Sequence, residues 1–239
     1  MPTTAAIELP RTFEEFNEQR RQSFLKVKDF KQAGGRLVGY LCSYTPLEVI
    51  DAAGASGVGL CGTSDEVISA AEEVLPANLC PLIKSTYGFA YSQKCPFTHF
   101  SDLIVGETTC DGKKKMYELL GELKPTYVLH LPQGRSREHE REGWYQEVVG
   151  LKRELERIYG IQITDDALRE ASRLRNRLRR AILALYDLQR SVPPAMSGVE
   201  LMSTMFAGTF NFDVRSYVES LERLCEQRRA AAEAGESPV

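Results

Sequence analysis

The sequence lacks any Cys-x-x-Cys pair among its six cysteines, and its three histidines show no spacing typical of a metal site. The first absence argues against a zinc ribbon and against a thioredoxin-like redox site. The Gly-x-x-x-x-Gly-Lys-Ser/Thr loop of nucleotide-hydrolysing proteins is also missing. Any metal site must therefore collect its ligands from loops that lie far apart in the sequence.

Strong charge of one sign and long apolar runs are absent as well. The net charge is −3, and a nucleic-acid binder usually shows a basic face, so we expect no nucleic-acid partner. No stretch approaches the roughly 18 apolar residues of a membrane span, and residues 1–10 lack the features of a signal peptide. We therefore expect no membrane partner, and we expect the protein to be located in the reducing cytoplasm. Cysteines there bind metal or react more often than they form disulfides.

Strand and helix patterns alternate through the first half of the chain. Of the 239 residues, 43% are hydrophobic, which is enough for a sizeable core without disulfides. The alternation predicts an α/β fold, a parallel sheet with helices on both faces. A helix over residues 12–32 is expected to precede this sheet. The expected strands are residues 36–41, 57–61, 102–105 and 127–131, and helices are expected to start near residues 46, 64, 81 and 111.

After Gln133 the pattern becomes entirely helical. Two long helices are expected between residues 136 and 190, followed by shorter ones over 199–206 and 212–232. We therefore divide the chain into an N-terminal helical segment (1–34), a cysteine-bearing α/β domain (35–135) and a helical segment (136–239).

Three cysteines lie beside expected helix starts. Cys42 follows the first strand, Cys110 follows the third, and Cys80 precedes Pro81. In open parallel sheets, ligands bind beyond the carboxyl ends of the strands. A helix N-terminus favours the thiolate form of cysteine, and thiolates select iron–sulfur clusters, zinc or Cu(I). Catalytic or simply packed thiols occupy such loops too, so these alternatives stay open.

The other cysteines are interpreted differently. Cys61, in Val-Gly-Leu-Cys-Gly, and Cys225, on a helix, are expected to be small buried hydrophobic residues. Cys95 is ambiguous, because Cys95-Pro96 repeats the Cys80-Pro81 pattern in a more polar stretch.

Charged residues near Cys110 raise two further alternatives. Lys113, Lys114 and Lys115 oppose the dipole of the helix that they begin, so they either form a solvated face or accompany an anion. Glu107 either acts as a general base or bonds to a loop backbone. His130 is interpreted as a satisfied core or pocket-edge group.

Three motifs resemble one known family. They are Cys42-Ser-Tyr-Thr-Pro-Leu-Glu-Val-Ile, Leu75-Pro-Ala-Asn-Leu-Cys80-Pro and Gly106-Glu-Thr-Thr-Cys110-Asp-Gly-Lys-Lys-Lys. In this order they resemble the 2-hydroxyacyl-CoA dehydratase / benzoyl-CoA reductase family, and within it the D-component and double-cubane cluster branch.

The resemblance implies a Rossmann-like sheet and an iron–sulfur cofactor. Members bind [4Fe-4S] clusters through cysteines, and they accept low-potential electrons from a separate ATP-hydrolysing iron–sulfur activator protein. Dehydratases, which are lyases, eliminate water from a 2-hydroxyacyl-CoA, whereas the double-cubane branch is similar to reductases of small molecules. Carried over by motif, the ligands are Cys42, Cys80 and Cys110, with Cys95 in Cys-Pro-Phe as a further candidate. Pairing with a second copy or a paralogous subunit is also implied.

The chain departs from the family pattern at its end. Members continue into a second Rossmann-like domain, whereas this chain stops at Val239, where the linker to that domain would begin. The expectation is a fragment or truncated product that carries half of a possible [8Fe-9S] double-cubane site. The alternative function is a non-catalytic remnant or interaction module that retains only the fold. A structural zinc protein is a third interpretation, disfavoured by the long spacings between ligands.

Overall fold

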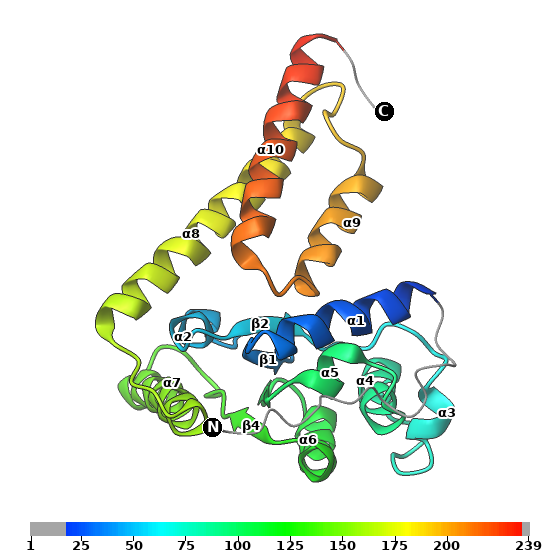
Figure 1. Ribbon diagram of the computed structural model, residues 1–239, viewed down its shortest axis with the longest axis vertical. Helices are drawn as coiled ribbons and strands as arrows, with labels where there is room; N and C mark the ends of the chain where they lie inside the picture. The colour runs from blue at the N-terminus through cyan, green and yellow to red at the C-terminus, as the bar shows by residue number, and fades with distance from the viewer. Residues whose placement is uncertain (1–17, 236–239) are drawn as a thin grey trace. The chain divides into compact units, whose positions relative to one another are not determined.

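The computed structural model describes residues 18–235, and the chain divides between Gln162 and Ile163 into two compact units (Figure 1). The first unit contains a four-stranded sheet and its helices. The second unit is helical throughout. The strands are β1 (Leu37–Tyr40), β2 (Ser56–Gly59), β3 (Leu103–Glu107) and β4 (Thr126–Leu129). The helices of the first unit are α1 (Glu18–Gln32), α2 (Leu47–Ala52), α3 (Ile68–Ala71), α4 (Pro81–Tyr91), α5 (Pro96–Phe100), α6 (Asp111–Leu123) and α7 (Glu138–Tyr159).

All strand pairs are parallel, and the strand order is β2-β1-β3-β4. Across the sheet, the step from β1 to β2 goes toward one edge, and the step from β3 to β4 goes toward the opposite edge. Right-handed crossovers therefore place α2 and α6 on opposite faces of the sheet. In agreement, α4 packs against α6, and α2 packs against α7. The predicted α/β fold with helices on both faces, followed by a helical segment, is confirmed.

Two strand boundaries differ from the sequence prediction. β3 continues past Val105 because Gly106 and Glu107 pair with Val128 and Leu129 of β4. β4 ends at Leu129. Two residues later, the backbone N–H of Leu131 donates to Thr108 Oγ1 at 2.8 Å instead of to a neighbouring strand.

Helix starts also differ in detail. α2 begins after Pro46, and Thr45, the expected cap, makes no side-chain cap; its buried Oγ1 has no hydrogen-bond partner among the described residues. The N-cap of α6 is Cys110, so Asp111 is the first helical residue rather than the cap.

Two further expectations concern the starts of α3 and α1. Ser64 Oγ accepts a hydrogen bond from Glu66 N at 3.3 Å within a turn, and α3 begins only at Ile68. The helix expected from residue 12 is present from Glu18, and residues 12–17 lie outside the described part of the chain.

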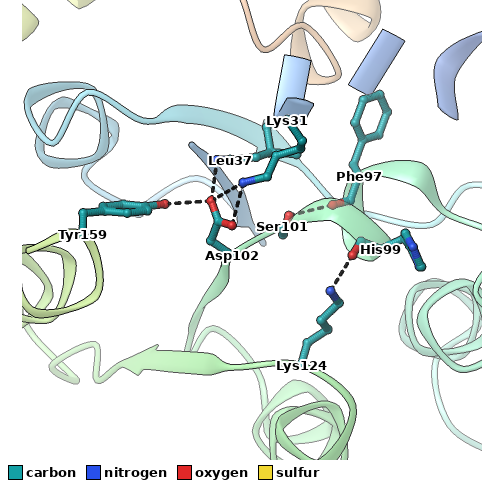
Figure 2. Close-up of polar contacts among 8 residues, drawn as sticks. All are labelled: Lys31, Leu37, Phe97, His99, Ser101, Asp102, Lys124 and Tyr159. Atoms are coloured by element: carbon teal, nitrogen blue, oxygen red, sulfur yellow. Dashed lines mark hydrogen bonds and ion pairs between the residues drawn. The ribbon is translucent and has the colours of Figure 1, made fainter. Parts of the chain in front are cut away.

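The amino edge of the sheet is held together by one carboxylate, that of Asp102 (Figure 2). It accepts hydrogen bonds from Lys31 Nζ at 2.6 and 2.7 Å, from Leu37 N at 2.9 Å and from the Tyr159 hydroxyl at 3.2 Å. These donors belong to α1, β1 and α7. Arg36 lies over the Tyr159 ring, 4.8 Å from its centroid, which adds a cation–π contact. The network therefore ties three elements to the start of β3.

The second unit consists of α8 (Asp165–Asp187), η2 (Leu188–Arg190), α9 (Gly198–Thr209) and α10 (Val214–Glu233). Thr164 caps α8 by accepting a hydrogen bond from Ala167 N at 3.2 Å, as its position predicts. Arg177 and Glu222 join α8 to α10 through two hydrogen bonds of 2.8 and 2.5 Å. The core between these helices includes Leu185, Met196, Leu221 and Cys225.

The division into units falls later than the segment boundary predicted at residue 135. Leu151 and Leu155 of α7 are fully buried, and α7 packs against α2 and β4. By its contacts α7 therefore belongs to the unit that holds the sheet. Among residues 18–235, no helix combines the length and apolar character needed to cross a membrane.

The Asp102 network predicts a clear effect on stability. We expect Asp102→Ala to lower the free energy of unfolding by about 2–3 kcal/mol, because several hydrogen bonds to a half-buried charge are lost together. Glu118→Ala is the control, since this carboxylate is 65% exposed and pairs with the exposed Lys115, and exposed pairs contribute little. Urea unfolding of both variants measures the difference, and equal losses would contradict the role given to Asp102.

Candidate functional site

The carboxyl edge between β1 and β3 is the point where the chain reverses its direction across the sheet. Such a topological switch point leaves a crevice in which α/β proteins bind ligands. Cys42 follows β1, Cys61 follows β2 and Cys110 follows β3, each within three residues of the strand end. Three thiols are thus delivered to one edge of the sheet.

Cys42 has an unusual backbone conformation. Its φ is +72°, in the left-handed region that residues other than glycine seldom adopt. Its Sγ accepts hydrogen bonds from Thr109 Oγ1, at 3.5 Å, and from Lys113 Nζ. The strained backbone and both partners hold the thiol toward the loop that follows β3, and such strain is typical of functional sites.

Lys113 lies beside these cysteines, and we use the name cysteine pocket for the group of side chains made up of Cys42, Cys61, Cys110 and Lys113. Its side chain is buried. Burial alone would lower the pKa of Lys113, but its contact with Cys42, together with the nearby Cys61 and Cys110, raises that pKa above its ordinary value. One ammonium therefore faces three of the six thiols.

Cys110 and Cys80 begin neighbouring helices. They are the N-cap residues of α6 and α4, and both are exposed. A Cβ atom on Gly112 would lie 2.8 Å from Ile83 Cδ1 and 3.0 Å from Leu79 Cδ1, so the first turns of the two helices are in close contact. A larger residue here would require the Ile83 and Leu79 side chains to shift. The packing brings the start of α4, with Cys80, beside the start of α6.

These thiols do not form a compact site for one ion. Within residues 18–235, no three His, Cys, Asp or Glu side chains are close enough to hold a single metal ion. In a [4Fe-4S] cluster each thiolate binds a different iron, so its ligands lie farther apart than those of one ion. The thiols of the described residues thus do not form a single-ion site, and thiolates are the ligands that iron–sulfur clusters use.

Cys95 lies elsewhere. It is the N-cap of α5, where its Sγ accepts a hydrogen bond from Thr98 N at 3.4 Å. It lines a cavity of about 260 Å³ with Tyr91 and Leu123, from the C-terminal ends of α4 and α6. Because α4 has 11 residues and rises 1.5 Å per residue, its two ends are about 15 Å apart. Cys95 is therefore at the opposite end of these helices from Cys80.

Glu107 is completely buried at the end of β3. Its Oε1 accepts a hydrogen bond from Tyr44 N at 2.7 Å, and the carboxylate also bonds to the backbone of Thr45. Its Oε2 has no partner among the described residues. Burial raises the pKa of this carboxyl, and the backbone donors and Lys113 oppose the shift only in part. One oxygen thus holds the loop after β1, and the other is buried without a hydrogen-bond partner among the described residues.

Tyr117 supports the same strand end from α6. Its hydroxyl donates to Glu107 O at 3.1 Å and accepts from Glu107 N at 3.2 Å. A Cβ atom on Gly106 would lie 2.6 Å from the Tyr117 ring, so the glycine makes room for the tyrosine. Burial raises the pKa of Tyr117 far above its ordinary value, which keeps the hydroxyl protonated.

The remaining polar candidates point outward. Lys114 pairs with Asp111 at 2.9 Å and Lys115 pairs with Glu118, and both lysines are exposed. Lys114 and Lys115 thus fit the first explanation of the lysine run, a solvated helix face. Lys113 fits the second, a position beside an anionic site. His130 is exposed and borders a cavity of about 670 Å³ beside β4 and α6, so it is a pocket-edge group and not a core residue.

Sequence reasoning missed Cys61. In the structure Tyr40 pairs with Gly59, and Cys42 and Cys61 each follow by two residues, a match that depends on strand register. The glycines around it also match the Gly-x-Gly-x-x-Gly spacing, at Gly57, Gly59 and Gly62. Two of these lie within β2, and Gly62 N donates to Thr86 Oγ1 at 2.9 Å. They therefore do not form the phosphate-binding turn that opens a helix in dinucleotide sites.

Several known proteins are similar to this chain in sequence. The family model for the 2-hydroxyglutaryl-CoA dehydratase D-component matches residues 42–239. A putative dehydratase subunit, YjiM, of Escherichia coli (strain K12) is 46% identical over 229 residues, covering 96% of this chain and 60% of that protein. The (R)-phenyllactyl-CoA dehydratase beta subunit of Clostridium sporogenes is 27% identical, over 80% of this chain and 47% of its own length.

A further relative is a benzoyl-CoA reductase subunit of Thauera aromatica. It is 26% identical over 192 residues, which make up 77% of this chain and 49% of the relative. This chain thus spans about half the length of the curated relatives that it matches, and at most 60%.

The buried Glu107 carboxylate leads to a prediction about stability and pH. We expect Glu107→Ala to lower the free energy of unfolding by about 1–3 kcal/mol, because buried N–H groups of the loop after β1 lose their acceptor. Glu107→Gln retains an acceptor oxygen and should lose less.

The pH dependence separates these variants further. Because burial raises the pKa of Glu107, the folded protein binds this proton more tightly than the unfolded chain does. Wild-type stability should therefore increase relative to Glu107→Gln as the pH falls from 7 toward about 4.3, the ordinary pKa of glutamate. Urea unfolding at pH 7 and pH 5 measures the difference, and an identical pH dependence in the two proteins would refute this role of burial.

Proposed function

The chain belongs to the 2-hydroxyglutaryl-CoA dehydratase D-component family, and on this premise we propose that it is an iron–sulfur component of a 2-hydroxyacyl-CoA dehydratase or of a related reductase. The observation that carries the proposal is the contact between the buried Lys113 ammonium and the Cys42 thiol, which joins the end of β1 to the first turn of α6, where Cys110 is the N-cap. This pocket lies at the topological switch point of the sheet, where an α/β protein is expected to hold its ligand.

Cys42, Cys80 and Cys110 would hold a [4Fe-4S] cluster, which would supply low-potential electron transfer. Cys80 and Cys110 lie at the N-termini of α4 and α6, and the partial positive charge of these helix ends suits an anionic cluster. Three ligands from this chain would also serve as half of a double-cubane [8Fe-9S] site. Cys95 stays outside the proposed set, because the helix geometry separates it from Cys80.

Glu107 is proposed to carry a proton in the reaction. Its Oε1 is engaged by the loop after β1, whereas its Oε2 is buried and has no hydrogen-bond partner among the described residues. The raised pKa brings the carboxyl closer to the working pH, which suits a group that both accepts and donates a proton. Tyr117 would position Glu107 by holding its backbone from α6.

The whole reaction is proposed to need further proteins. An ATP-hydrolysing iron–sulfur activator would supply the electron, and a second copy or a paralogous subunit would complete the assembly. The relatives' own names support partner subunits, since one is the beta subunit of a dehydratase and another is a subunit of a reductase. The proposed substrate is a 2-hydroxyacyl-CoA, with a small molecule as the alternative, and the proposed compartment is the cytoplasm.

The competing proposal is a non-catalytic interaction module that retains the fold. It is favoured by α9, in which Val199 is 77% exposed and Met202 66% exposed, while Phe206 is partly exposed. Apolar side chains that gather on one exposed helix are typical of a surface that contacts another protein. A module of this kind would fold without binding iron, so the same measurement separates the two proposals.

Anaerobic reconstitution with iron and sulfide tests the proposed function. We expect the wild-type chain to take up about four irons and four sulfides and to give an electron paramagnetic resonance signal after dithionite reduction. Cys42→Ser, Cys80→Ser and Cys110→Ser should each reduce iron uptake substantially. Cys225→Ser and Cys95→Ser are the controls and should load normally, since neither thiol is at this edge of the sheet. A folded wild type that binds no iron would favour the interaction module.

A further inference from the structure

We propose that Lys113 is a positioning residue whose ammonium remains beside the bound cluster and makes that cluster easier to reduce. The inference rests on the proposed function, because it concerns the cofactor held by Cys42, Cys80 and Cys110. It concerns a residue that is not itself a ligand, and it assigns to one lysine of the Lys113–Lys115 run a task that the other two do not share.

The orientation of Lys113 is the first support. Its relative exposure is 7%, whereas the side chains of Lys114 and Lys115 are 46% and 70% exposed. Lys113 Nζ contacts Cys42 Sγ although the two residues are 71 positions apart in the sequence. The side chain thus reaches from the first turn of α6 to the end of β1, across the opening of the pocket.

The charges that face Lys113 are the second support. Cys42 comes from the end of β1, Cys61 from the end of β2 and Cys110 from the start of α6, and Glu107 faces it from β3. Within the described residues, Lys113 makes no ion pair with a carboxylate; its hydrogen-bond partner is a thiol sulfur. A buried ammonium is costly unless an anion compensates it. An anionic cluster bound to these cysteines would provide that compensation.

The effect on the cluster follows from electrostatics. One-electron reduction makes the cluster more negative by one charge, without forming or breaking a bond. A fixed positive charge beside it therefore stabilises the reduced form more than the oxidised form. The Lys113 side chain is buried, so salt screens its charge less than it screens that of an exposed lysine. Lys113 would thus raise the reduction potential and favour arrival of an electron from the activator.

The test is an anaerobic redox titration of the reconstituted chain, followed by electron paramagnetic resonance with dithionite as the reductant. Lys113→Met keeps the length of the side chain but removes its charge. We expect it to lower the equilibrium constant for reduction about tenfold, which corresponds to a potential lower by about 59 mV for one electron. Lys113→Arg keeps the charge and should stay within about threefold of wild type. Lys115→Met is the matched control and should not change the potential.

Each outcome has a distinct meaning. A wild-type chain that binds no iron overturns the proposed function and this inference together. A loaded wild type whose potential equals that of Lys113→Met overturns the inference alone. If Lys113→Met folds by circular dichroism but fails to load, then loading of Lys113→Arg supports a need for the charge. Failure of both variants to load would indicate a packing role instead and would overturn the inference.

Discussion

The pairing of β1 with β3 depends on two carboxylates, one at each end of β3. At the amino edge Asp102 accepts a hydrogen bond from Leu37 N, where β1 begins. At the carboxyl edge Glu107 accepts one from Tyr44 N, just after β1 ends, across 63 residues of sequence. Both contacts bind a backbone N–H that the sheet itself leaves without an acceptor. Together they fix the register of the central strands, and that register determines which loops meet at the cysteine pocket.

The two carboxylates have different surroundings, and the difference separates stability from chemistry. Asp102 is engaged by a lysine, a backbone amide and a tyrosine hydroxyl, so all of its hydrogen-bonding capacity serves the fold. Glu107 is more deeply buried but keeps one oxygen free. A free acceptor in a buried position lowers stability, and it persists where the surrounding structure or a ligand compensates for it. The carboxyl edge is therefore the part of the sheet that is built for a bound group.

Much of this arrangement could be predicted from the sequence. Helix and strand patterns predicted the parallel sheet, and three motifs placed the chain in its family, which the comparisons confirm. Local sequence could not predict the role of Cys61, because its nearness to Cys42 depends on strand register, a long-range property. Cys95-Pro96 and Cys80-Pro81 begin helices in the same way, yet lie at opposite ends of α4. The inward turn of Lys113 likewise follows from packing, which adjacent lysines do not reveal.

The order of strands in the sheet also governs when the pocket can exist. β1 lies between β2 and β3, so its second neighbour is synthesised only after β2 and three further helices. Pairing of β1 with β3 closes a long loop, and it is delayed until the segments between these two strands have been synthesised. During translation, Cys42 therefore emerges well before Lys113 and Cys110, which arrive only with α6. Metal delivery to a nascent chain would meet isolated thiols, so the cluster proposed for this site must be inserted after the sheet has folded.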